Sequence, residues 1–342
     1  MDNHKILRRF DLEMESLRET KRHFSKLGMR LFLGALFCFV IQYIAMLLAD
    51  RIAPAFMNNS DLSLIITMLP LYCIGMPILA FLIRQLPSTP VAKHKMSLGQ
   101  WFTAFCICYG LMYVSNLLGV FTTEIIGNLK GGTVENVVAE LLSDISPWSA
   151  IPFTVILAPI FEELIFRKLI IDRTTKYGEG IAILVSATLF ALFHGNLNQF
   201  AYAVVLGLFW GFLYVKTGTV KYTIFMHMAI NFLGSVPGML MMRSGFYQEL
   251  LSLQNPSDLQ AMLLFLSEHA WELIFSFLYS LFVMIFAITG IVLFFVKRKN
   301  MHLCTGEITI PNGKRFRTIV LNLGMLLNTA YWGIQILLQL LH

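Results

Sequence analysis

The chain has 342 residues, of which 57% are hydrophobic and 13% are charged, and its formal net charge is +6 at neutral pH. The average apolar share of a soluble domain is about 45–50%, so the composition excludes an ordinary soluble protein and indicates an integral membrane protein. Because the basic residues lie in loops between apolar runs, the positive charge indicates contact with anionic lipid headgroups and not with nucleic acid.

The apolar runs predict a helical bundle. A helix that crosses a bilayer needs about 20 apolar residues. Long apolar runs lie at 31–49, 62–83, 99–121, 148–166, 222–242, 271–296 and 318–341, and two shorter runs lie at 181–194 and 199–215. The sequence therefore predicts an all-α polytopic membrane protein of about eight to nine transmembrane helices. The glycines of "GLFWG" at 207–211 are expected to let two of these helices pack closely.

The loops divide the chain and orient it. Residues 1–30 are predicted to be a cytoplasmic amphipathic arm, 31–296 a membrane-embedded domain, 297–317 a cytoplasmic linker and 318–342 an additional C-terminal helix. This arrangement places 23 of the 26 Lys and Arg residues on the cytoplasmic side, as the positive-inside rule requires. The three that remain outside are Arg51, Lys130 and Arg243.

Ionisable residues inside the predicted spans are few. Glu162 and Glu163, in "FEELIFR" at 161–167, lie well inside a span, and of the eight histidines only His194 and His227 do. A charged side chain at the bilayer centre costs about 2.5–3.5 kcal/mol on insertion scales, so these residues are candidates for function. The five cysteines show no zinc or disulfide spacing.

Helical spacing gives the two glutamates different roles. Glu163 and Arg167 are four residues apart, so they share a helix face and are expected to form an ion pair. Glu162 is rotated by about 100° and has no basic residue at i+4, so it is available for chemistry. Pro152 and Pro159 are expected to kink this helix and to free backbone carbonyls.

Two further pairs have the same spacing. Phe190 and His194, in "FALFH", share a face, and His227 and Asn231, in "HMAIN", share another. An acid, a histidine and a pair of hydrogen-bond donors on three helices are suited to hydrolysis. The helix rise places His194 deeper than Glu162, so the groups meet only if the helix that ends at His194 is tilted or sunk, with a water-filled cavity open to the cytoplasm.

These motifs resemble those of a known family. "EELIFR", "FALFH" and "HMAIN" fit EExxxR, FxxxH and HxxxN in order, and the core 145–235 is similar to the CPBP intramembrane proteases. That group includes CAAX prenyl proteases, bacteriocin-processing enzymes and self-immunity proteins. The resemblance implies an endopeptidase that acts on membrane-associated peptides or proteins, in this case in a bacterial plasma membrane.

The resemblance also implies a role for each motif residue. Glu162 would be the catalytic base, His194 would position or polarise the attacking water, and His227 with Asn231 would form the oxyanion hole. Glu163, Arg167 and Phe190 would support the site, and no cofactor is expected. The additional C-terminal helix departs from the usual eight-helix layout of the family.

Other interpretations remain open. Glu162, His194 and His227 could instead bind zinc with a water as the fourth ligand, although HExxH is absent and Asn231 is a poor zinc ligand. A non-catalytic scaffold or immunity protein of the same fold would be expected to have lost a motif residue. A proton-coupled transporter would show paired broken helices or repeated halves, and neither pattern is visible.

Overall fold

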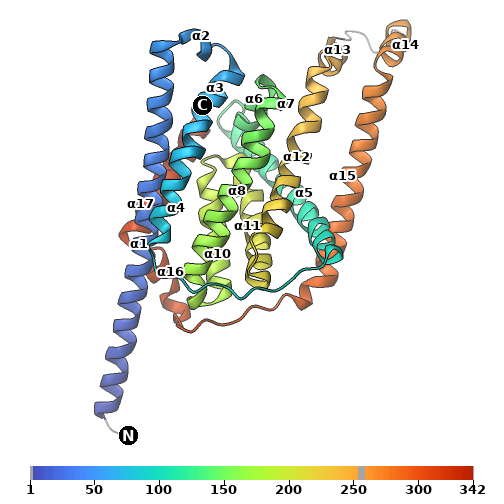
Figure 1. The fold of residues 1–342 in the computed structure, drawn as a ribbon. Coiled ribbons are helices and arrows are strands. Elements are labelled where there is room, and N and C mark those ends of the chain that lie inside the picture. Colours follow the sequence, from blue (N-terminus) through green and yellow to red (C-terminus); the bar gives the residue numbers. More distant parts are fainter. Residues whose placement is uncertain (1–2, 253–258, 342) are drawn as a thin grey trace.

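The computed structural model describes residues 3–252 and 259–341, and these residues form helices joined by turns and extended segments, without a β-strand among them (Figure 1). The helices of the first half are α1 (Asn3–Ile52), α2 (Pro54–Met57), α3 (Ser60–Pro70), η1 (Leu71–Gly75), α4 (Met76–Arg84), α5 (Leu98–Leu129), α6 (Val137–Asp144), α7 (Pro147–Ala150), η2 (Ile151–Leu157), α8 (Ala158–Glu162) and η3 (Glu163–Ile171). Those of the second half are α9 (Asp172–Thr174), η4 (Thr175–Tyr177), α10 (Glu179–Phe193), α11 (Leu197–Thr217), α12 (Lys221–Arg243), α13 (Phe246–Ser252), α14 (Leu259–Glu268), α15 (Ala270–Lys297), η5 (Arg298–Asn300), η6 (Asn312–Lys314), α16 (Arg315–Ile319) and α17 (Leu323–Leu341).

Seven continuous helical stretches of the described chain are long and apolar enough to cross a membrane, and the bent pair at the C-terminal end would make an eighth. The prediction of an all-α polytopic membrane protein is therefore confirmed. All nine apolar runs are helical, but the run at 181–194 gives a helix of only 15 residues, Glu179–Phe193. At a rise of 1.5 Å per residue this helix is about 22 Å long, shorter than a hydrocarbon core of about 30 Å. The end of α10 that carries His194 therefore lies inside the bundle.

The first helix shows no break at residue 30, where the predicted arm was expected to end. α1 is continuous from Asn3 to Ile52, and residues 1 and 2 lie outside the described residues. Phe24 and Leu27 are fully buried, and the His23 ring bonds to the Arg173 carbonyl at 2.9 Å. Helical periodicity thus continues through the expected boundary, and the last part of the arm packs against the domain.

The helices α10 and α11 pack through small residues. A Cβ atom on Gly207 would lie 2.8 Å from the Ala187 Cα atom, and one on Gly211 would lie 3.1 Å from an Ile183 methyl group. Both glycines of "GLFWG" therefore face α10, as expected for a small-xxx-small pattern.

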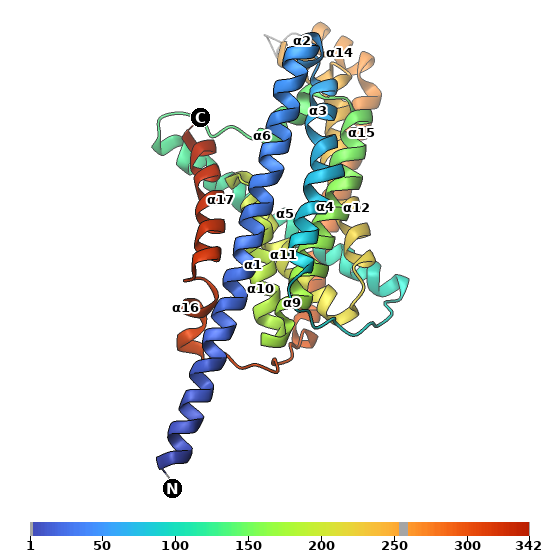
Figure 2. The ribbon, with the colours of Figure 1, turned by 60° about the vertical axis from the view of Figure 1, so that its left-hand side comes forward.

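The C-terminal segment is bent where a straight span was predicted at 318–342. α16 and α17 meet at 69°, and α17 runs alongside α1 (Figure 2). The Asn322 side chain donates to the Thr318 and Ile319 carbonyls and accepts from the Met325 N–H. It therefore closes one helix and caps the next, which explains the break. Residue 342 lies outside the described residues.

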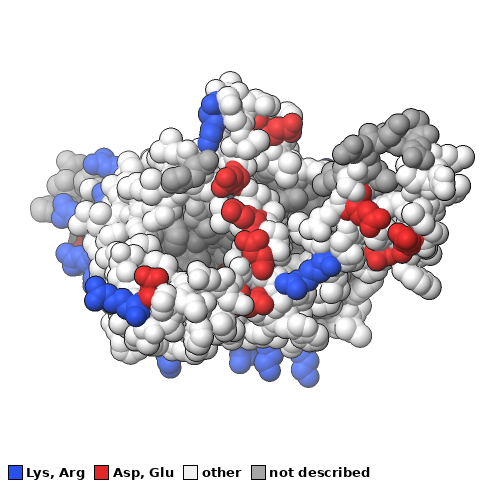
Figure 3. All heavy atoms as spheres, turned by 90° about the horizontal axis from the view of Figure 1, so that it is seen from above, with Lys and Arg blue, Asp and Glu red and all other residues white. Residues whose placement is uncertain are grey.

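The α10–α11 turn is covered by distant segments. The Leu197 N–H donates to the Gln339 side chain at 3.2 Å, and the Gln339 amide donates to the Glu135 carbonyl at 3.0 Å. Irregular backbone inside a membrane needs such partners because lipid tails offer no hydrogen bonds. The end of the molecule near α2 and α14 carries a row of acidic side chains (Figure 3).

Candidate active site

The helix that carries the two glutamates is irregular, and the irregularity frees a backbone carbonyl. In η2 the Ala158 N–H donates to the Phe153 carbonyl, which is an i to i−5 bond. In the same register the Thr154 carbonyl would accept from residue 159, but Pro159 has no N–H. The Thr154 carbonyl instead accepts from the Asn231 side-chain amide at 2.8 Å. The freed carbonyl thus fixes one of the motif residues on α12.

Glu163 and Arg167 form a fully buried ion pair. The distance from Arg167 Nη2 to Glu163 Oε1 is 3.1 Å, and neither side chain is exposed to solvent. The Arg167 guanidinium lies 4.3 Å from the centre of the Phe190 ring, and its Nη1 is 3.5 Å from the Ser186 hydroxyl. Such a pair is costly to bury but more costly to break, because a single buried charge would remain.

His227 lies between the two glutamates. Its Nδ1 is 3.3 Å from Glu163 Oε1, and its Nε2 is 3.8 Å from Glu162 Oε2. The imidazole stacks on the Trp210 ring at 4.4 Å between ring centres, and the Trp210 N–H donates to the Cys108 sulfur at 3.2 Å. The ring is therefore held on its face by Trp210 and at Nδ1 by Glu163, while Nε2 points towards Glu162.

Glu162 differs from Glu163 in access. Its side chain is 13% exposed, whereas that of Glu163 is fully buried. Within residues 3–252 and 259–341, Glu162 forms no ion pair with a lysine or arginine. Glu162 is thus the acid that a substrate or a water molecule can reach.

His194 lies at the end of α10 and is joined to the same cluster through Phe190. Its Nδ1 is 2.9 Å from the Phe190 carbonyl, and its ring lies 4.8 Å from the Phe190 ring. The Phe190 ring also lies 5.9 Å from His227. Since a carbonyl only accepts, Nδ1 must donate, and Nε2 of the neutral ring is left as an acceptor.

The sequence patterns did not single out three parts of this cluster. Trp210 stacks on His227, Ser186 contacts Arg167, and the Thr154 carbonyl accepts from Asn231. Trp210 directly precedes Gly211 in the pattern that was assigned to helix packing. The sequence therefore indicated that Trp210 lies near a helix contact, but not that it stacks on His227. The other two depend on which helices are adjacent.

No group of three or more His, Cys, Asp or Glu side chains in the described residues is placed to hold a metal ion. The zinc arrangement of Glu162, His194 and His227 would need these three side chains to converge further than they do here.

The comparisons agree with the motifs. Residues 144–233, which include every motif residue from Glu162 to Asn231, match the family described as Type II CAAX prenyl endopeptidase Rce1-like. This segment, called the Rce1-like segment below, is similar to that family over about a quarter of the chain. The resemblance to CPBP proteases is thereby confirmed for the Rce1-like segment.

A curated relative also matches part of the chain. The Bacillus subtilis (strain 168) protein named "Putative membrane peptidase YdiL" is 31% identical over 90 residues. The match covers 24% of this chain and 36% of the relative, so it spans about a third of that protein. No solved structure matches the chain.

Proposed function

We propose that the protein is an intramembrane endopeptidase that cleaves peptide bonds in membrane-associated peptides or proteins. The observation that carries the proposal is the contrast between adjacent acids: Glu163 is buried and neutralised by Arg167, whereas Glu162 is accessible and faces His227. The Rce1-like match of the segment that holds these residues supports the same activity.

Glu162 acts as the general base in this proposal. It takes a proton from a water molecule whose other hydrogen is accepted by Nε2 of His194. The hydroxide attacks the peptide carbonyl, and Glu162 returns its proton to the leaving amine, so that the carboxylate is regenerated. The bond from His194 Nδ1 to the Phe190 carbonyl supports this role because it fixes which nitrogen accepts.

His227 and Asn231 stabilise the oxyanion. The Asn231 amide has two hydrogens and gives one to Thr154, so the second is available to a substrate oxygen. Nδ1 of His227 faces Glu163 and Nε2 faces Glu162, so Nε2 is the nitrogen that can donate to a substrate oxygen beside Glu162 when it carries a hydrogen. A donor of this kind contributes about 3 kcal/mol to transition-state stabilisation in other enzymes.

The zinc mechanism is the alternative that uses the same residues. Cleavage by the purified protein should survive a strong chelator if Glu162 works without metal. Loss of cleavage with the chelator, and its return on addition of zinc, would favour the zinc site.

We further infer a bacterial plasma membrane with the N-terminus in the cytoplasm. The positions of the Lys and Arg residues and the Bacillus subtilis relative support this placement. A reporter enzyme that works only outside the cytoplasm should then be active when it is fused after α17.

Comparative peptidomics of membranes that contain the wild-type protein or Glu162→Gln tests the function without a known substrate. A precursor that accumulates only with the variant would identify the substrate. If neither Glu162→Gln nor the pair Glu162→Ala and His194→Ala changes the peptides or the phenotype of the cells, a non-catalytic scaffold is the better account.

A further inference from the structure

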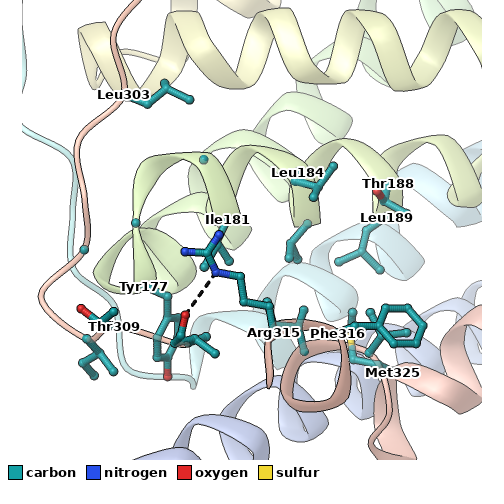
Figure 4. A pocket seen from close by; sticks show the side chains of 18 of the residues that line it. Tyr177, Ile181, Leu184, Thr188, Leu189, Leu303, Thr309, Arg315, Phe316 and Met325 are labelled. Carbon is teal, nitrogen blue, oxygen red and sulfur yellow. Dashed lines mark hydrogen bonds between the residues drawn. The ribbon is translucent and has the colours of Figure 1, made fainter. Parts of the chain in front are cut away.

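A cavity of about 810 Å³ lies beside α10, between this helix, the extended segment 303–310 and the α16–α17 bend (Figure 4). Ligand sites for small molecules usually have volumes of about 300–1,000 Å³, so its size suits one ligand. It opens at exposed apolar side chains, which include Leu184, Leu303 and Phe316.

The cavity is separate from the candidate active site. Ile181, Leu184 and Thr188 line it and share one face of α10. Ser186 and Phe190 contact Arg167. They lie two residues before and two residues after Thr188, and a step of two residues is a rotation of about 200°, so both are on the other side of the helix. α10 therefore has the active site on one side and the cavity on the other.

Hydrogen bonds hold the wall formed by the extended segment. The Glu179 N–H donates to the Cys304 carbonyl at 3.1 Å, and the Ile308 N–H donates to the Lys176 carbonyl at 2.9 Å. The Glu179 carboxylate also accepts from the Cys304 N–H at 2.8 Å. The cavity is thus built into the fold where the linker packs on the N-terminal end of α10.

The lining is apolar except for a few hydroxyl groups and one cation. Arg315 extends into the cavity towards Ile181, and its Nε donates to the Ile310 carbonyl at 3.1 Å (Figure 4). Neither of its terminal nitrogens has a hydrogen-bond or ion-pair partner in the described part of the chain. Four donor hydrogens are therefore free beside an apolar chamber, a combination that suits a ligand with an anionic head and a hydrocarbon tail.

We propose that this cavity binds an anionic glycerophospholipid from the leaflet at that end of the bundle. An acyl chain lies along the apolar face of α10, and the phosphate accepts from the Arg315 guanidinium. The neighbouring Lys314 and Arg317 give the segment 311–317 a charge of the sign that attracts anionic headgroups to the membrane surface.

The test compares two lipids that have identical acyl chains. The purified full-length protein in detergent is titrated with phosphatidylglycerol or with phosphatidylcholine, and its Tm and its lipid adducts in native mass spectrometry are measured. A ligand that binds the folded state raises Tm. Both headgroups contain a phosphate, but the choline cation of phosphatidylcholine neutralises the headgroup. Phosphatidylglycerol should therefore raise Tm more and should bind about tenfold more tightly, a difference of about 1.4 kcal/mol.

Matched variants separate a site from general surface charge. Arg315→Gln should remove the preference for phosphatidylglycerol, whereas Arg317→Gln, which changes an exposed residue of the same segment that does not line the cavity, should keep it. Leu184→Trp, at an exposed position on the cavity wall, should weaken the binding of both lipids. The proposal would be overturned if the two lipids shifted Tm equally, or if Arg315→Gln and Arg317→Gln lost the preference for phosphatidylglycerol equally. Adducts with the mass of a peptide would overturn it as well.

Discussion

At the scale of single residues, two consecutive positions of one helix carry two kinds of acid. The Glu163 side chain is buried in an ion pair with Arg167, whereas the Glu162 side chain is partly exposed and lies next to His227. Both are glutamates in the same apolar helix, so chemical type alone does not distinguish them. The difference comes from which face of the helix each occupies.

Exchange of each acid for its amide should therefore give opposite results. Glu162→Gln is expected to lower cleavage by at least about 10²-fold with Tm unchanged, because only proton transfer is removed. Glu163→Gln should destabilise the fold by about 3–5 kcal/mol, because Arg167 is left as an uncompensated buried charge. Cleavage of a precursor found by peptidomics and thermal unfolding of both purified variants measure the two effects. A Glu162→Gln protein with full activity would refute the assignment of the base.

At the scale of elements, two prolines and a π-helical register shape the glutamate helix. The Thr154 carbonyl lacks a helical donor because residue 159 is proline, and Asn231 of α12 supplies the bond. The same amide is proposed to serve the oxyanion. The Asn231 side chain is thus expected both to stabilise the glutamate helix and to take part in cleavage. A second substitution can separate these two effects.

Asn231→Ala should lower kcat by about 10²–10³-fold through loss of an oxyanion donor. It should also cost about 1–3 kcal/mol of stability because the partly buried Thr154 carbonyl is left without a partner. Adding Pro159→Ala restores a backbone N–H near that carbonyl, so the double variant should regain Tm but not activity. Recovery of both would show that Asn231 only positions the helix.

The segment between α12 and α15 contains a histidine with a raised pKa. The His269 Nε2 hydrogen bond to Glu249, at 2.9 Å, raises the pKa of this imidazole, and Glu272 adds to the shift from 3.8 Å. The ordinary pKa is about 6.5. A raised pKa in the folded state means that the contact stabilises fully below the ordinary value and is lost as pH rises through the raised one.

We therefore expect α13 to be held less firmly at high pH. Hydrogen exchange of the Phe246–Ser252 amides, corrected for the intrinsic pH dependence, should show less protection at pH 9 than at pH 6. Glu249→Gln should remove most of this difference. Equal protection of these amides at pH 6 and pH 9 in the wild-type protein would contradict this prediction.

Much of this arrangement could be predicted from the sequence because it is local. Apolar runs predicted the helices, and i, i+4 spacing predicted the Glu163–Arg167 pair. The stacking of Trp210 on His227 could not be predicted, since it joins two helices whose crossing is set by the whole bundle. The bend at Asn322 was missed for a different reason: its polar side chain lies within a run of apolar residues that is long enough for one span.

At the scale of the whole molecule, the additional C-terminal helix is packed tightly against the first one. A Cβ atom on Gly324 would lie 1.8 Å from the Ser25 carbonyl oxygen, and one on Gly28 would lie 2.4 Å from the Met325 nitrogen. The Gly324 N–H also donates to the Ser25 hydroxyl at 3.2 Å. Such contact requires that both positions lack a side chain.

Gly324→Val should separate α17 from α1 and lower both Tm and cleavage activity. Gly333→Val is the matched control, because a Cβ atom at residue 333 of the same helix has no atom within 4 Å. The control should leave Tm and activity unchanged. The two purified variants are compared by thermal unfolding. An equal loss of Tm in both would show that valine destabilises this helix irrespective of its contact with α1.

The hydrogen bond between Gln339 and Leu197 joins residues 142 positions apart. A ribosome delivers the α10–α11 turn to the membrane long before it delivers α17. Until the last helix arrives, the backbone beside His194 lacks the partner that holds it in the finished protein. A newly synthesised chain would therefore complete the candidate active site only after α17 has been inserted, later than the helices that surround the site.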